Sequence, residues 1–161
     1  GLGFTLRNLF KDAKGDYLIY FDADAYKCFH LADIKKLIEE IKNYDAVIAS
    51  RYKESTKNVP WYRIYPSVIY FWVYRILFNL PIRDIGSGFV MFRRKAINSI
   101  NLKSNGFDIH LEIYAKLKRA GFKIREFPVY YRHWYGGSFD VLKHGPKTLL
   151  NTFRIWLEMF K

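Results

Sequence analysis

Two short apolar segments separated by one amphipathic segment constrain the fold of this chain most strongly. Residues 17–21 and 46–49 are apolar runs of strand length, and residues 31–41 carry apolar side chains at helical spacing. A strand, a helix and a second strand within about 35 residues form a parallel βαβ unit, because the helix returns the chain to the starting edge of the sheet. We therefore predict an α/β fold with a mostly parallel sheet.

The remaining sequence patterns extend this α/β architecture. They predict helices over residues 2–13, 61–80, 109–120 and 142–160, and strands over residues 89–92 and 124–131. Gly15 and Gly121 are expected to end two of these helices, and Pro66 is expected to kink or delimit the apolar segment 61–80. Pro128 predicts an edge position for the last strand, since proline cannot donate a ladder hydrogen bond. The 161 residues, half of them hydrophobic, are expected to form one domain.

The positive charge of the chain is concentrated in its second part. The formal net charge is +12, and residues 51–161 carry 20 basic and 7 acidic side chains. This imbalance predicts an anionic partner, such as a phosphate, a lipid headgroup or a nucleic acid. No helix-turn-helix, RNA-recognition or zinc pattern is readable, so we expect no nucleic acid partner. The single cysteine, Cys28, excludes an internal disulfide bond.

Two segments could contact a membrane surface without crossing it. Residues 61–80 are apolar but interrupted by arginines, and residues 140–161 predict a basic amphipathic helix. Neither contains the roughly 18 uncharged apolar residues that a membrane-spanning helix needs. Trp and Phe beside basic side chains suit anionic headgroups. Packing against the sheet or against a second copy of the chain is an equal alternative.

The acidic pair Asp22 and Asp24 is the strongest candidate for a functional site. The pair directly follows the apolar strand 17–21, so both carboxylates leave the sheet at a carboxyl end, where open α/β sheets bind ligands. Residues two apart in an extended segment point the same way, and Mg²⁺ prefers one or two carboxylates together with substrate phosphates. The pair therefore predicts a divalent metal site, although an Asp-x-Asp sequence also occurs by chance in loops and in helix caps.

Basic and hydroxyl side chains that suit an anion follow the second strand. Arg51 stands at the end of that strand, on the edge expected to carry the aspartates, and its guanidinium can form two parallel hydrogen bonds to phosphate oxygens. Arg63 and Ser67 are four residues apart and lie on one face of a helical segment. The alternative for Arg51 is a surface ion pair with Glu54, and an arginine four residues before a serine is weak evidence alone.

A glycine-rich segment and a polar helix supply further candidates. The segment Asp84-Ile-Gly-Ser-Gly-Phe89 allows either a close approach of the backbone to a ligand or an ordinary turn. His110 and Glu112 on the following predicted helix are candidates for acid–base chemistry or sugar contacts, or they are plain exposed helix positions. Both alternatives stay open at the level of the sequence.

Taken together and in order, these motifs resemble those of the family-2 glycosyltransferases of the GT-A fold. The residues that carry the resemblance are Gly1, Gly3, Arg7, Gly15, Asp16, Asp22, Asp24, Arg51, Tyr52, Arg63, Ser67, Asp84, Ser87, Phe89, Glu112, Gly121, Glu126 and Pro128. Within the family, the chain looks most similar to the dolichol-phosphate mannosyltransferase and polyprenyl-phosphate glycosyltransferase group. The resemblance covers nearly the whole chain.

The resemblance implies an inverting transfer of a sugar from a nucleotide diphosphate-sugar, of the GDP-mannose or UDP-glucose type, to a polyprenyl phosphate. It also implies a peripheral enzyme on the cytoplasmic face of a membrane. By the same resemblance, Asp22 and Asp24 of the DxD motif would hold Mg²⁺ or Mn²⁺ on the donor diphosphate. A lipid phosphate is already anionic, so the acceptor needs positioning and charge compensation more than a general base.

The resemblance assigns further roles at the same site. The implied ligands of the acceptor phosphate are Arg51, Arg63, Ser67, Arg132 and Ser138. The implied catalytic group is Asp22, Asp24, Arg51 and Asp84. Within that group, Asp84 would orient the sugar or the loop that carries it.

The chain also departs from the family pattern. Family members begin with a strand and a helix that carry a ProxxAsnGlu-like loop, followed by a strand ending in AspAspGlySer, and neither nucleoside-pocket motif is present. We therefore expect residues 1–161 to be a partial GT-A catalytic domain that lacks the first βαβ portion. Tyr26 replaces the glutamine that often follows the acidic pair, and Arg132 stands one position early in its loop. Two alternatives are transfer to a polysaccharide or soluble acceptor, and a non-catalytic remnant that binds phosphate or membranes.

Overall fold

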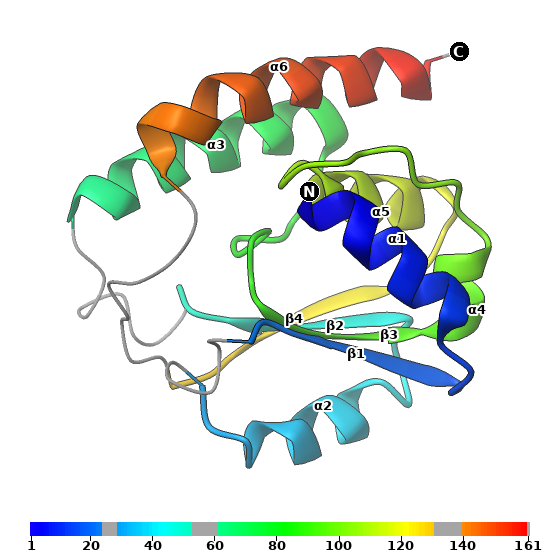
Figure 1. Ribbon diagram of the computed structural model, residues 1–161. Coiled ribbons are helices and arrows are strands. Elements are labelled where there is room, and N and C mark those ends of the chain that lie inside the picture. Colours follow the sequence, from blue (N-terminus) through cyan, green and yellow to red (C-terminus); the bar gives the residue numbers. More distant parts are fainter. Residues whose placement is uncertain (24–28, 53–60, 131–139, 161) are drawn as a thin grey trace.

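The computed structural model describes residues 1–23, 29–52, 61–130 and 140–160, without the side chains of Arg63 and Val141 (Figure 1). The described residues contain a four-stranded sheet with the order β1-β3-β2-β4. Its strands are β1 (Tyr17–Phe21), β2 (Ala46–Ser50), β3 (Phe89–Arg93) and β4 (Ile124–Pro128).

The predicted strand–helix–strand unit is present, and β3, which runs in the opposite direction, lies between its two strands. β3 pairs antiparallel with both β1 and β2, so β1 and β2 run in the same direction on either side of it. β4 pairs parallel with β2, and Ile48 lies opposite Glu126 in this register. Three of the four described strands therefore share a direction, but two of the three pairings are antiparallel, so the described sheet is mixed. Pro128 ends β4 at an edge of the described sheet, which confirms the expectation from its missing amide hydrogen.

Helices cover both faces of the sheet and produce three layers (Figure 1). On one face, α2 (Asp33–Glu40) packs through Leu37 into a core cluster with Phe89 of β3. The helices on the other face are α1 (Leu2–Asp12), α4 (Arg94–Asn98) and α5 (Ile109–Arg119). Their apolar side chains join Phe92 of β3 in the larger core cluster. All five residues of β2 are buried, as expected for a strand covered on both faces.

Two longer helices lie side by side outside these layers, beyond α5 (Figure 1). They are α3 (Trp61–Phe78) and α6 (Val141–Met159). The hydroxyl oxygens of Tyr70 and Thr152 form a hydrogen bond of 2.9 Å between them. α3 continues through Pro66, so this proline does not delimit the helix. In the part of the chain that the structure describes, no helix has the length and the apolar content needed to cross a membrane.

Some helix positions differ from the sequence expectations. α1 ends before Gly15, because its C-cap residue already has extended backbone angles, so this glycine does not end the helix. Gly121 follows the end of α5 with a φ of 80°, as predicted for a C-terminal glycine. Leu37 of α2 is buried, whereas Leu31 and Ile38 of the same predicted apolar face are exposed. Helical spacing alone therefore does not reveal which of these apolar side chains are buried.

Candidate functional site

The carboxyl ends of β1 and β2 meet at one edge of the sheet, and two predicted site residues follow directly from them. Asp22 comes after β1, and Arg51 comes after β2. Because β3 runs in the opposite direction, the segment that precedes it, residues 84–88, reaches the same edge. The topology thus brings an acidic side chain, a basic side chain and the glycine-rich segment together.

Asp22 is held at this edge by contacts on both sides. Its backbone N–H donates to the Gly88 carbonyl over 2.9 Å, and its Oδ1 accepts a hydrogen bond from the Tyr20 hydroxyl. Gly88 lies so close to the carboxylate that a Cβ at this position would overlap it. This glycine therefore allows a close approach of the backbone to a side chain. Asp24 lies outside the described residues, and those residues contain no group of three or more His, Cys, Asp or Glu arranged for a metal ion.

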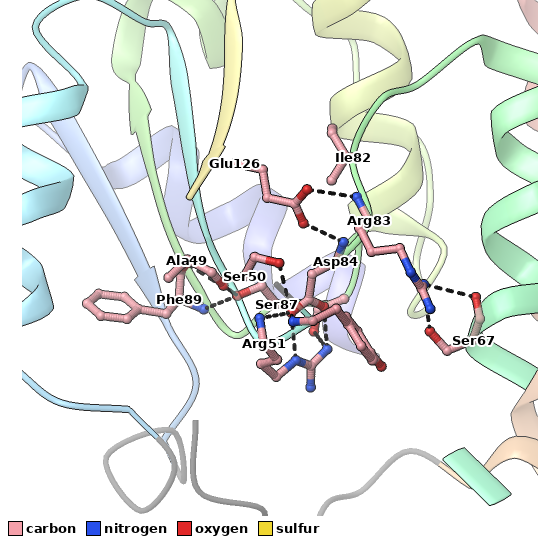
Figure 2. Close-up of polar contacts among 12 residues, drawn as sticks. Ala49, Ser50, Arg51, Ser67, Ile82, Arg83, Asp84, Ser87, Phe89 and Glu126 are labelled. Carbon is pink, nitrogen blue, oxygen red and sulfur yellow. Dashed lines mark hydrogen bonds and ion pairs between the residues drawn. The ribbon is translucent and has the colours of Figure 1, made fainter. Parts of the chain in front are cut away.

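Arg51 forms an ion pair with the buried Asp84 (Figure 2). The Asp84 carboxylate accepts from Arg51 Nε over 2.8 Å, from Nη2 over 2.6 Å and from the Arg51 backbone N–H over 2.9 Å. Nη2 also donates to the Gly86 carbonyl over 3.1 Å. The Asp84 side chain is 1% exposed, and the double hydrogen bond fixes the plane of the guanidinium. Asp84 thus orients Arg51 and the glycine-rich segment.

Two side chains to which the sequence analysis assigned no role fasten the segment before β3. Glu126 of β4 accepts from the backbone N–H groups of Arg83 over 2.9 Å and of Asp84 over 2.7 Å (Figure 2). The Tyr74 hydroxyl of α3 donates to the carbonyls of Ile82 over 2.9 Å and of Arg83 over 3.2 Å, and burial raises the pKa of this phenol. An acidic residue at an inward-facing strand position could have revealed Glu126, because a buried carboxylate needs hydrogen-bond donors.

Ser67 of α3 contacts an arginine that the sequence analysis did not consider. Arg83 donates through Nη1 to Ser67 Oγ over 3.1 Å and to the Ser67 carbonyl over 3.3 Å (Figure 2). The Arg83 guanidinium also lies over the rings of Tyr52 and Phe71, at 4.6 Å and 5.2 Å from their centroids. Aromatic rings at these distances attract a cation and restrict its movement. Arg83 is therefore a member of the basic side of this edge.

Some of the predicted phosphate ligands have side chains outside the described part of the chain, namely Arg63, Arg132 and Ser138. The structure does place Arg51 and Ser67. The guanidinium of Arg51 lies 5.6 Å from the centroid of the Tyr52 ring, which Arg83 also approaches. Since Arg83 in turn donates to Ser67, Arg83 and Tyr52 link the two predicted ligands Arg51 and Ser67.

His110 and Glu112 are buried on α5, so the expectation of plain exposed positions is wrong. Glu112 accepts from the backbone N–H groups of Lys103 over 3.0 Å and of Ser104 over 2.8 Å, and from the Lys116 ammonium. Burial alone would raise the pKa of Glu112, but the hydrogen bonds from Lys116 and from the two amides outweigh it and hold the pKa below its ordinary value. Glu112 thus anchors the segment that precedes α5.

His110 faces the strand that carries the acidic side of the site. Its ring centroid lies 5.4 Å from that of Tyr20, whose hydroxyl donates to Asp22. Burial lowers the pKa of His110 to about 4, although the negative charge of Asp22 acts in the opposite direction. The imidazole beside Tyr20 is therefore neutral near pH 7.

The burial of neutral His110 predicts a loss of stability in mild acid. In the unfolded chain histidine titrates near pH 6.5, so the unfolded state gains a proton that the folded state binds only near pH 4. The free energy of unfolding should therefore fall by up to about 3 kcal/mol as the pH decreases through this range, in addition to the effect of the carboxylates. Urea titrations of the wild type and of His110→Gln measure the difference, with His144→Gln as the control. If His110→Gln kept the full wild-type pH dependence, the buried histidine would not be its source.

The outer helices expose apolar side chains that we call the outer apolar surface. On α3 these are Trp61, Tyr62, Tyr65, Ile69, Trp72 and Ile76, and on α6 and its C-cap they are Leu142, Leu149, Leu150, Phe153, Leu157 and Phe160. The inward-facing residues of α6 include the buried Thr152 and Ile155. The apolar positions predicted for the last helix therefore point away from the described protein, and these side chains do not pack on the sheet.

Comparisons of the sequence with known proteins identify its family. The sequence profile described as Glycosyl transferase family 2 matches residues 1–100. The chain is 39% identical over 135 residues to dolichol-phosphate mannosyltransferase of Pyrococcus furiosus and 31% identical over 134 residues to glycosyltransferase AglD of Haloferax volcanii. Both alignments cover 80% of this chain, but they cover 37% of the first relative and 21% of the second. The chain thus spans well under half the length of these two relatives.

The fold is similar to the crystal structure of glucosyl-3-phosphoglycerate synthase from Mycobacterium tuberculosis in complex with phosphoglyceric acid. The TM-score is 0.67 at 14% sequence identity, and the match covers 98% of this chain and 54% of that chain. This similarity concerns the fold alone, and it confirms the predicted GT-A class. The profile match extends over more than half of the residues and includes Asp22, Arg51 and Ser67. The chain belongs to glycosyl transferase family 2.

Proposed function

We propose that the protein transfers a sugar from a nucleotide diphosphate-sugar to a polyprenyl phosphate, with a divalent metal ion at the donor. The observation that carries this proposal is the meeting of Asp22 with the guanidinium groups of Arg51 and Arg83 and the hydroxyl of Ser67 at one edge of the sheet. The acidic side suits a metal ion and a diphosphate, and the basic side suits a second anion. Similarity to a protein named dolichol-phosphate mannosyltransferase supports the choice of acceptor.

On the donor side, Asp22 and Asp24 would hold Mg²⁺ or Mn²⁺. Asp22 fits this role because its carboxylate accepts from the Tyr20 hydroxyl but forms no ion pair with any basic side chain of the described residues. One or two carboxylates suffice for such an ion, since phosphate oxygens and water complete its coordination. When bound, the ion would neutralise the charge that develops on the leaving nucleoside diphosphate.

On the acceptor side, the ligands of the phosphate would be Arg51, Arg63, Ser67, Arg132 and Ser138. These residues would orient an acceptor that is already an anion and would offset its charge, so the reaction needs little help from a general base. The hydrogen bonds to Asp84 would keep the Arg51 guanidinium in a fixed plane for this contact. Attack by the phosphate oxygen in line with the leaving nucleotide would invert the anomeric centre of the sugar.

The outer apolar surface would rest on the cytoplasmic face of a membrane. Ser67 lies on the inward side of α3, and the other side of the same helix exposes Ile69 and Trp72. A membrane resting on α3 would therefore bring its lipid phosphates to the helix that carries part of the acceptor site. Lys147 and Arg154 are exposed on α6 beside the apolar residues, and they would contact anionic headgroups. This arrangement would bring a membrane-bound acceptor to a protein that lies on the surface of the bilayer.

Ile69→Ser combined with Trp72→Ser is expected to reduce partitioning onto lipid vesicles by about tenfold or more. Full burial of one large apolar side chain contributes about 1.5–3 kcal/mol, and about 1.4 kcal/mol corresponds to a factor of ten. Co-sedimentation with vesicles that contain anionic lipid measures the partitioning. Ile38→Ser is the matched control, because Ile38 is an exposed apolar residue of α2 on the other face of the sheet. Equal partitioning of the double variant and the wild type would exclude the proposed orientation.

The function is tested by supplying a labelled nucleotide sugar with two competing acceptors, a polyprenyl phosphate in vesicles and a soluble oligosaccharide. We expect the label to extract with the lipid. A chelator should abolish this labelling of the lipid, and addition of Mn²⁺ should restore it. Label on the oligosaccharide would favour a transferase with a soluble or polysaccharide acceptor. Absence of label from both acceptors would favour a non-catalytic remnant.

A further inference from the structure

We infer that Arg83 is a direct ligand of a phosphate monoester, acting together with the hydroxyl of Ser67. This inference rests on the proposed function, because the monoester would be the head of the polyprenyl phosphate. Arg83 stands outside the residues that the family resemblance assigns to the acceptor. It is instead the tertiary structure that brings Arg83, from the segment before β3, against Ser67 of α3.

The Arg83 side chain is held in place from several directions. Its own backbone is fixed, since the N–H donates to Glu126 and the carbonyl accepts from Tyr74. Nη1 donates to Ser67, and the rings of Tyr52 and Phe71 flank the guanidinium. A cation fixed in this way loses little conformational entropy when a ligand binds. The geometry is that of a preorganised binding group.

The positive charge of Arg83 has no acidic partner among the described residues. Its contacts are with the hydroxyl and the carbonyl of Ser67 and with two aromatic rings, and no described carboxylate lies within ion-pair distance of the guanidinium. Arg51 is different, because Asp84 compensates its charge. A half-buried guanidinium without a counter-ion is unfavourable unless an anion compensates it. A phosphate group would supply that charge.

The surroundings of Arg83 fit a phosphate in particular. Ser67 Oγ accepts from Arg83, so its hydroxyl hydrogen points elsewhere and can be donated to a phosphate oxygen. Nε and Nη2 of Arg83 donate to no described group, and an arginine can present two parallel donors to phosphate. Arg51 and Arg83 both approach the Tyr52 ring, at 5.6 Å and 4.6 Å from its centroid. A doubly charged anion beside this ring would therefore meet two guanidinium groups, and only that of Arg51 already has an acidic partner.

Arg83→Gln is expected to raise the KM for the polyprenyl phosphate by about 10- to 100-fold and to leave the KM for the nucleotide sugar within about twofold. The estimate follows from a charge-assisted hydrogen bond that contributes about 1.5–3 kcal/mol. Arg83→Lys keeps the charge but not the two-pronged geometry, so it should recover part of the affinity. Steady-state kinetics with each substrate varied in turn separates the two constants.

Arg93→Gln is the control that shows the effect of removing an arginine with a purely structural role. Arg93 also donates to backbone carbonyls, those of Ile41, Lys42 and Tyr44, and its guanidinium lies 5.5 Å from the centroid of the Tyr17 ring. It stands at the opposite end of the sheet from Arg51. Arg93 also forms an ion pair of 3.7 Å with Asp45, so Arg93→Gln should lower stability at least as much as Arg83→Gln without changing the KM for the lipid phosphate.

Direct titration of the protein with farnesyl phosphate, with inorganic phosphate and with GDP, in the absence of donor sugar, distinguishes the sources of the phosphate. We expect farnesyl phosphate binding to weaken in Arg83→Gln and GDP binding to be unchanged. An unchanged acceptor KM in both Arg83 variants, or a loss confined to GDP, would overturn the inference while leaving lipid glycosylation intact. If the wild type transfers no sugar to lipid phosphate but binds farnesyl phosphate through Arg83, the proposed function fails and the inference stands. If Arg83→Gln does not fold, the acceptor KM of Arg83→Lys is compared with that of the wild type, and an unchanged value overturns the inference.

Discussion

Asp22→Asn is expected to lower the rate of sugar transfer by about 100- to 1,000-fold while changing the free energy of unfolding by less than about 1 kcal/mol. The substitution removes the negative charge that would hold the metal ion. An amide of nearly the same shape still accepts from the Tyr20 hydroxyl, and the backbone bond to the Gly88 carbonyl is untouched. Initial rates with nucleotide sugar and polyprenyl phosphate measure the first effect, and urea denaturation measures the second.

Two further variants make this result specific to the position of the carboxylate. Asp16→Asn is the matched control, because Asp16 directly precedes β1 as Asp22 directly follows it, and its side chain is 88% exposed. This variant should keep the wild-type rate. Gly88→Ala leaves all charges in place but should displace the Asp22 carboxylate and lower the rate as well. A wild-type rate in the Asp22→Asn variant would show that Asp22 is not part of the site.

Asp84→Asn is expected to lower the free energy of unfolding by about 3–5 kcal/mol. Asp84 is buried, accepts hydrogen bonds through both carboxylate oxygens from Arg51, and supplies the charge that compensates this guanidinium. An asparagine would leave the guanidinium without its counter-charge and would turn one acceptor into an amide donor. Urea denaturation monitored by tryptophan fluorescence measures the loss.

A double-mutant cycle with Arg51→Met tests whether this loss belongs to the ion pair. The double variant should be more stable than the sum of the two single losses predicts, with a coupling energy of at least about 1 kcal/mol. The exposed pair of Asp16 and Arg94, whose charged atoms lie 3.4 Å apart, is the control and should couple by less than about 0.5 kcal/mol. Strictly additive losses for Arg51 and Asp84 would contradict the role given to this pair.

Local sequence patterns were sufficient to predict the direction of β1 and β2, and therefore the shared edge that carries Asp22 and Arg51. They could not predict that β3 lies between these strands, because strand order depends on pairing between residues far apart in the chain. The same limit applies to α6. Its spacing predicted an apolar face, but the structure was needed to show that Thr152 and Ile155 face inward while Leu150 is exposed.

The polar network around the site shows why part of it escaped prediction. Asp22, Arg51 and Asp84 are found from sequence because they lie next to strand ends or glycines. Arg83 and Glu126 carry no local signal of this kind, since their roles arise from contacts with α3 and with the segment before β3. Ser67 follows Arg63 by four residues in sequence, but it accepts a hydrogen bond from Arg83, which only the fold brings to it.

The central claim is that Asp22 holds a divalent ion against the diphosphate of a nucleotide sugar. Isothermal titration of GDP-mannose and of UDP-glucose into the protein, with and without Mn²⁺, measures this most directly. We expect one of the two donors to bind only when Mn²⁺ is present, and we expect this binding to disappear in Asp22→Asn. Binding of equal strength without Mn²⁺, or in the Asp22→Asn variant, would contradict the claim.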